Sequence, residues 1–127
     1  MNPFENINLE QVNEYFLQLY NDLPNPLFVK NKAGEYVFIN RELELFWQTE
    51  RSQVIGKTDF DLLPKDEAQA CVDSDQISFQ HLDEVSRSFE NQYDEHGNIK
   101  NYISVNKRTV NTAFGQFLIG VVTLVAV

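Results

Sequence analysis

The sequence predicts an α+β fold, a five-stranded antiparallel sheet with helices on one face and a flanking helix at the N-terminus. The strand-like runs fall into two groups, short ones at residues 27–30 and 36–40 and longer ones at residues 86–93, 99–110 and 117–127. Within each group only short turn sequences separate the runs, which favours hairpins and therefore antiparallel pairing. The stretch between the groups has helical patterning, so one long crossover joins two hairpin units.

The composition is that of one globular domain. The 127 residues are 43% hydrophobic and 13% aromatic, which excludes a disordered tail or a coiled-coil rod. A net charge of −9 argues against direct binding to nucleic acid or to an anionic membrane, because both are negatively charged. Cys71 is the only cysteine, which excludes an intrachain disulfide and a cysteine zinc site. With no secretory signal at residues 1–14, we expect a cytoplasmic protein.

The N-terminal segment predicts an amphipathic helix over residues 8–22. Its apolar residues recur at spacings of three, four, three and four, which places on one helix face Leu9, Val12, Phe16, Leu19 and Leu23. Either the helix covers its own sheet or it pairs with a second copy of the chain. We take these five residues as candidates for a homodimer interface, because exposed apolar seams usually mark interfaces. Residues 1–22 are expected to form a flanking segment and residues 23–127 the domain proper.

Turn and capping signals separate the predicted elements. The first hairpin turns at Gly34, which can adopt a positive φ. Asn40 is expected to cap a helix over residues 41–48, because its side-chain oxygen can accept a hydrogen bond from a free backbone N–H. Turns at residues 94–97 and 111–115 divide the last three strands.

The middle of the chain predicts short helices followed by a longer one. Helical turns are expected near Ser52 and near Thr58 or Asp59. The longer helix has Asp66 and Glu67 in its first turn, where the helix dipole favours acidic side chains. One face of that helix is traced by Ala68, Cys71 or Val72, Asp75, Phe79 and Leu82.

Five residue strings follow one another in a characteristic order. They are DLPNPLFVK at residues 22–30, YVFIN at 36–40, VIGKTDFDLLP at 54–64, YISVNK at 102–107 and LIGVV at 118–122. Together with the element order, this set resembles the PAS domain family over about residues 22–125. Asp75 falls where the long helix of that family often has an acidic residue.

The resemblance implies a non-catalytic sensory or dimerisation module of a bacterial-type signalling protein. The family's sheet and central helices enclose a pocket that holds a ligand or is filled by side chains. From strand parity and this analogy, the pocket candidates are Val29, Ile39, Leu43, Trp47, Phe60, Cys71, Ile103, Val105 and Val121. The implied partners are a second copy of the chain and a linked output domain, such as a histidine kinase, diguanylate cyclase or transcription regulator.

Haem and flavin are not expected as cofactors. Flavin-binding photoreceptors of the family have a reactive cysteine in a Gly-x-Asn-Cys motif, where this chain has Asp59. Cys71 lies on the next helix and is interpreted as a small buried side chain. His81 and His96 are expected at the surface, at a helix end and in a turn, where they would not ligate haem. The alternatives that remain for the pocket are a small metabolite and no ligand at all.

The acidic residues Asp59, Asp61, Asp66 and Glu67 lie close together in the sequence. We interpret them as helix caps and a solvated acidic surface, with no catalytic or metal-binding role. The five glycines are spread out and form no phosphate-binding loop.

Two other functions compete with ligand sensing. One is a ligand-free PAS-like domain used for dimerisation. The other is a small cone-shaped α+β enzyme, which a buried carboxylate inside a cavity would support. Two residues depart from the family pattern. Leu82 stands where relatives often have glycine, and Leu124 is the first residue at the position where relatives often have the sequence Asp-Ile-Thr. Either the signal leaves by another route or the chain is a piece cut near its output linker.

Overall fold

The computed structural model of the protein describes residues 9–126, apart from the side chain of Ala126. Its helices are α1 (Leu9–Tyr20), α2 (Arg41–Trp47), the short 3-10 helix η1 (Arg51–Gln53), α3 (Asp59–Leu62) and α4 (Lys65–Gln80). Its strands are β1 (Leu27–Asn31), β2 (Tyr36–Ile39), β3 (Ser86–Tyr93), β4 (Ile99–Thr112) and β5 (Gly115–Ala126). The order of helices and strands is the one that the sequence predicts.

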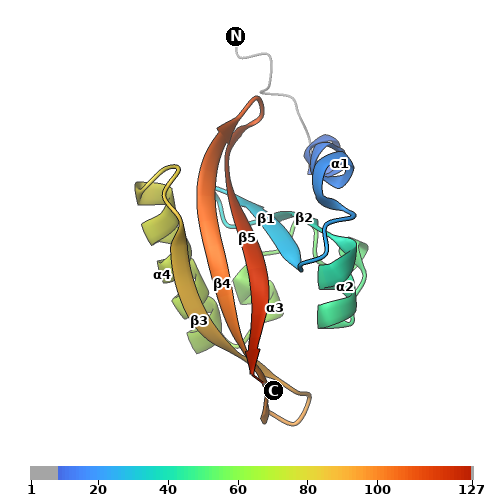
Figure 1. Ribbon diagram of the computed structural model, residues 1–127, viewed down its shortest axis with the longest axis vertical. Helices are drawn as coiled ribbons and strands as arrows, with labels where there is room; N and C mark the ends of the chain where they lie inside the picture. Colours follow the sequence, from blue (N-terminus) through green and yellow to red (C-terminus); the bar gives the residue numbers. More distant parts are fainter. Residues whose placement is uncertain (1–8, 127) are drawn as a thin grey trace.

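The strands form one antiparallel sheet in the order β2-β1-β5-β4-β3 (Figure 1). The last strand, β5, therefore lies between the two hairpins. Val29 of β1 faces Ile119 on one side of β5, and Val105 of β4 faces Val122 on the other. The predicted fold class is confirmed, because both groups of strands belong to a single sheet.

The two faces of the sheet pack against different helices. The inner face packs against the central helical segment, with a core of Phe28, Tyr36, Ile39, Leu43, Val54, Ile103, Val105, Leu118 and Val122. The outer face packs against α1, with a core of Val12, Phe16, Leu27, Val29, Val37, Phe38 and Phe117. Successive side chains of a strand point to opposite faces, so neighbours such as Phe28 and Val29 belong to different cores.

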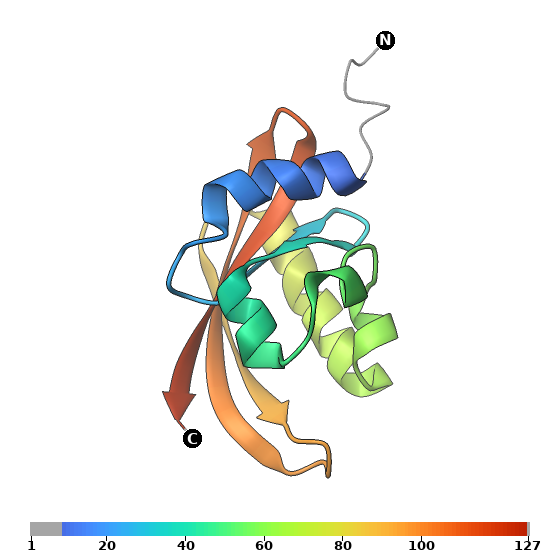
Figure 2. The same cartoon turned by 90° about the vertical axis from the view of Figure 1, so that its right-hand side faces the viewer.

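Helix α1 crosses the sheet near the β4–β5 hairpin (Figure 2). The ring of Tyr15 packs edge-on against Phe114 of that hairpin, with 4.8 Å between ring centroids. The helix ends at Tyr20, two residues before the predicted end, and the predicted first residue, Asn8, lies outside the described residues. Among residues 9–126 no helix is both long and apolar enough to cross a bilayer.

The β4–β5 turn is tighter than the sequence predicts. The ladder continues to the pair Thr112 and Gly115, so only residues 113–114 form the turn. The Thr112 hydroxyl accepts a hydrogen bond from the N–H of Phe114 at 3.1 Å and donates one to the carbonyl of Gly115 at 3.0 Å. The prediction of a turn over residues 111–115 is therefore wrong at both edges, because this threonine stabilises a two-residue connection.

Asn40 links the first hairpin to α2. Its side-chain oxygen accepts hydrogen bonds from the N–H groups of Leu43 and Leu27, each at 3.0 Å. Its side-chain amide donates to the carbonyl of Asn25 at 2.9 Å. The predicted cap of α2 is confirmed, and the same side chain also fixes the start of β1.

Gly120 of β5 lies directly under an aromatic ring. A Cβ at this position would overlap the ring of Phe28 on the neighbouring strand, which faces Gly120 across the ladder. The absence of a side chain at residue 120 therefore lets Phe28 lie flat against the inner face of β5.

Candidate functional site

Four charged side chains are buried between the inner face of the sheet and helices α3 and α4. They are Lys30 of β1, Asp59 of α3, Asp75 of α4 and Lys107 of β4, each at most 5% exposed. Strand alternation explains how the lysines come to face inward. Lys30 follows Phe28 at a spacing of two, and Lys107 follows Val105 in the same way, so both share the parity of the inner core.

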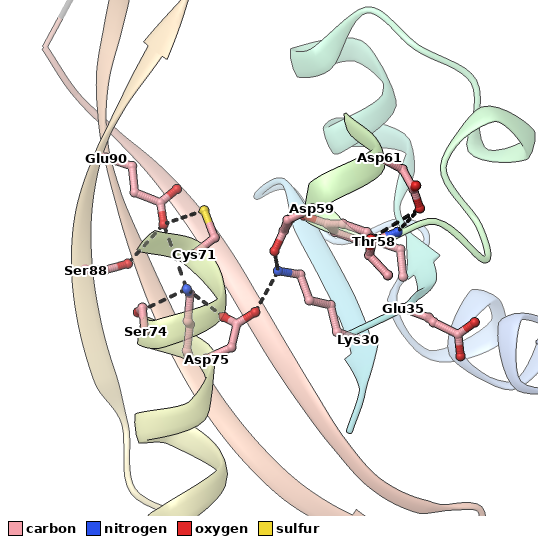
Figure 3. A network of polar contacts seen from close by, with 12 residues as sticks. Lys30, Glu35, Thr58, Asp59, Asp61, Cys71, Ser74, Asp75, Ser88 and Glu90 are labelled. Atoms are coloured by element: carbon pink, nitrogen blue, oxygen red, sulfur yellow. Dashed lines mark hydrogen bonds and ion pairs between the residues drawn. The ribbon is translucent and has the colours of Figure 1, made fainter. Parts of the chain in front are cut away.

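The ammonium group of Lys30 bridges two carboxylates, those of Asp59 on α3 and Asp75 on α4 (Figure 3). Its Nζ lies 2.6 Å from Oδ2 of Asp59 and 2.7 Å from Oδ2 of Asp75. The same nitrogen lies 4.8 Å from the ring centroid of Tyr36 and 5.2 Å from that of Phe28. Burial by itself disfavours the ammonium form, but the two carboxylates outweigh that effect and raise the pKa of Lys30 above its usual value.

Lys107 holds the other side of Asp75. Its Nζ lies 2.8 Å from Oδ1 of Asp75, an ion pair whose angles fall outside those of a hydrogen bond. It also donates to the hydroxyl of Ser74 at 3.2 Å and lies 3.8 Å from Oε1 of Glu90. Asp75 is thus shared by both lysines, which joins β1 and β4 through a single residue of α4.

Tyr36 extends the network on the β2 side. Its hydroxyl donates to Oδ1 of Asp59 at 2.6 Å. Burial, together with the neighbouring carboxylate of Asp59, holds the pKa of Tyr36 well above its usual value. The phenol therefore remains a neutral donor that satisfies the second oxygen of Asp59.

Cys71 lies at the β3 edge of the network. Its Sγ is 3.9 Å from Oε1 of Glu90, whose side chain is 30% exposed. Burial and the carboxylate of Glu90 raise the pKa of the Cys71 thiol to about 12. Since the thiolate is the reactive form, a raised pKa lowers the reactivity expected of this thiol. Cys71 is partly buried, where the sequence predicts a buried side chain, and its place among the pocket residues stays a prediction.

The network is built to hold charges in fixed pairs. Lys30 and Lys107 balance Asp59 and Asp75, and Glu90 adds a negative charge at the rim. Paired and hydrogen-bonded charges are the form in which buried ions are tolerated. The described residues contain no group of three or more histidine, cysteine, aspartate or glutamate side chains placed to bind a metal ion.

The predicted pocket residues fall on both faces of the sheet. Ile39, Leu43, Ile103 and Val105 belong to the inner core, and Trp47 packs against it. Val29 and Val121 lie instead on the outer face with α1, because they have the opposite strand parity. Phe60 is 48% exposed. Val29 and Val121 therefore do not face the inner core as predicted, and Phe60 of α3 is a surface residue where the sequence predicts an interior one.

The five interface candidates of the N-terminal segment also divide into two sets. Val12 and Phe16 are buried against the protein's own sheet, and Leu9 packs partly against the same core. Leu19 and Leu23 are 50% and 41% exposed. Helix α1 thus covers its own sheet with one part of the seam and leaves Leu19 at the surface, while Leu23 lies beyond the end of the helix at Tyr20.

The acidic residues near α3 have two different environments. Asp61 forms a capping box with Thr58, as its side chain accepts from the Thr58 N–H at 2.9 Å. Asp59, two residues earlier, is 2% exposed and pairs with Lys30. The interpretation of Asp59 as a surface or capping residue was therefore wrong, because its charge is matched by a lysine from β1.

Comparison with known protein families identifies the family of this chain. The family model described as the PAS fold matches residues 14–109. The chain belongs to the PAS family. No curated protein sequence matches this PAS domain at a significant level.

Solved structures similar to this PAS domain share its fold. The PAS domain of BvgS from Bordetella pertussis has a TM-score of 0.72 and 17% identity, over 90% of this chain and 86% of that one. A PAS domain from a two-component sensor histidine kinase has a TM-score of 0.57 and 13% identity, over 92% and 99%. Vibrio cholera VqmA, in a complex with ligand and DNA, has a TM-score of 0.70 and 16% identity, over 87% and 50%.

Proposed function

We propose that this PAS domain is a non-catalytic sensory module that biases a linked output domain when a ligand or partner binds. Residues 23–127 form the sensory domain in this proposal, and residues 1–22 form a flanking segment. The two buried carboxylates, Asp59 and Asp75, are engaged by lysines, which argues against a role in acid–base catalysis. The similar structures that come from a histidine kinase and a DNA-bound regulator support an output of either kind. The single thiol supports a cytoplasmic location.

The observation that supports this proposal is the position of the lysines on either side of β5. Lys30 faces Leu118 across the β1–β5 ladder, and Lys107 faces Gly120 across the β4–β5 ladder. Both strands that flank β5 are therefore tied to Asp75 of α4. A change in the position of α3 or α4 would act on β5, the strand that leads to the C-terminal end of the chain.

Hydrogen exchange in the whole chain tests this coupling. Asp59→Asn is expected to speed exchange of the β5 amides at residues 118–122 by about tenfold, because Lys30 loses a charged partner. The amides of α1 serve as the internal reference for any global loss of stability. Asp61→Asn, on the same short helix but at the surface, is the matched control and should leave β5 unchanged. Equal effects on β5 and α1 would contradict the coupling.

A second candidate, dimerisation without a ligand, is favoured by exposed aromatic residues on the sheet. Phe89 of β3 and Tyr102 of β4 are 72% and 47% exposed. Phe89 alternates with Ser88 and Glu90, both of which are partly buried on the network side, so Phe89 faces outward. Apolar surface of this kind on a sheet face is typical of contacts between protein chains.

Light scattering distinguishes this second candidate. If a second copy covers this face, Phe89→Glu should convert a dimer to a monomer, since a charge would be buried in the contact. Ile77→Glu, at a side chain of α4 that is 55% exposed, is the control and should leave the mass unchanged. A wild-type chain that is monomeric at high concentration, or a dimer that persists in Phe89→Glu, would contradict dimerisation through this sheet face.

A further inference from the structure

The surroundings of the Lys30 ammonium have the chemistry of a receptor for an alkylammonium ion. Two carboxylates, from Asp59 and Asp75, lie within 2.7 Å of the nitrogen. Two aromatic rings, from Phe28 and Tyr36, lie within 5.2 Å. Carboxylates supply charge and hydrogen-bond acceptors, and aromatic faces attract a cation through their quadrupole.

The walls of this site come from four separate elements. Phe28 lies on β1, Tyr36 on β2, Asp59 on α3 and Asp75 on α4. The backbone of each of these four elements positions its own residue, so we expect the four side chains to stay close to one another without the side chain of Lys30. Tyr36 also fixes one wall directly, since its hydroxyl donates to Asp59 at 2.6 Å.

We propose that Lys30 is a built-in ligand, a side chain that occupies an ammonium-binding site formed by Asp59, Asp75, Phe28 and Tyr36. Removing the side chain while keeping the site would leave two buried carboxylates without the cation that they share. Such a site would take up a free primary alkylammonium ion of matching length. In the native chain the side chain of Lys30 fills this site, so a free alkylammonium ion cannot enter it.

The second buried lysine provides a natural comparison. Lys107 has Asp75, Ser74 and Glu90 around its nitrogen, and neither of the two aromatic rings that face the Lys30 nitrogen is placed over it. Its surroundings include the partly exposed Glu90, where water competes for the cation. A vacancy at residue 107 should therefore hold a free amine more weakly than a vacancy at residue 30.

Chemical rescue of Lys30→Ala tests the proposal. The atoms removed beyond Cβ correspond to n-propylammonium, which is the probe. We expect Lys30→Ala to lower the Tm by about 10 °C or more, and about 100 mM n-propylammonium chloride to recover about 5 °C of it. n-Propanol at the same concentration, which has the length but not the charge, should recover none. Wild type should show no shift, and Lys107→Ala a smaller one.

Other outcomes would overturn the proposal. They are an equal shift in wild type, an equal shift with n-propanol, or no shift in a folded Lys30→Ala. If Lys30→Ala is unfolded alone, n-propylammonium should restore its folded circular dichroism spectrum, and failure to do so at about 100 mM also overturns it. Adding Asp59→Asn to Lys30→Ala should abolish the rescue. None of these results depends on whether the domain signals, so the proposed function is tested separately by hydrogen exchange.

Discussion

Asp75→Ala is expected to lower the free energy of unfolding by about 3–5 kcal/mol. Asp75 is the one carboxylate shared by Lys30 and Lys107, with contacts of 2.7 and 2.8 Å. Its removal leaves Lys107 deep in the protein with only the more distant carboxylate of Glu90 at 3.8 Å. Leaving a buried charge without a partner costs far more than the net value of the pair. Urea denaturation followed by circular dichroism measures the change.

Asp73→Ala is the matched control for this experiment. Asp73 lies on the same helix two residues earlier, is exposed, and accepts a hydrogen bond from Gln69 at the surface. Its replacement should change the free energy of unfolding by no more than about 0.5 kcal/mol. A loss for Asp75→Ala as small as that of Asp73→Ala would show that the buried network does not stabilise the domain.

Phe16→Ala is expected to cost about 3–5 kcal/mol. Phe16 is 1% exposed and its ring stacks on Tyr20, packs edge-on against Phe117 and lies tilted against Phe38. The substitution would leave a cavity and remove the ring contacts that join α1 to Phe38 and Phe117 of the sheet. Thermal unfolding of the purified chain measures this loss as a fall in Tm.

Leu19→Ala separates the two roles of the α1 seam. Leu19 is 50% exposed, so its replacement should change stability by no more than about 0.5 kcal/mol. If α1 contacts a second copy through this residue, Leu19→Ala should weaken the association measured by light scattering while leaving the fold intact. A Phe16→Ala chain as stable as Leu19→Ala would contradict the assignment of Phe16 to the core.

The sequence predicts the framework well because local rules determine it. Asn40 caps α2 as expected, since an asparagine next to a helix start has an oxygen within reach of the first free N–H. The spacing of Val12 and Phe16 correctly marks the face of α1 that packs on the sheet. The family strings place β5 beside β1, which local patterning alone does not determine.

The buried network could be predicted only in part. Strand alternation places Lys30 and Lys107 on the inner parity, a signal that the sequence contains and that points to buried charge. The two partners of Lys30 are 29 and 45 residues away in the sequence, so neighbouring sequence gives no sign of the pairing. Asp59 and Asp61 have the same side chain two residues apart, and only the folded helix decides which one is buried.

The central place of β5 also determines how a nascent chain can mature. The strands β1 and β4 have no ladder with each other, and each pairs with β5, whose bounds are Gly115–Ala126. As the ribosome delivers the chain from its N-terminus, both flanking hairpins emerge before the strand that unites them. Until β5 leaves the exit tunnel, the hairpins have open edges that can mispair, so the sheet can be completed only after β5 itself has been synthesised.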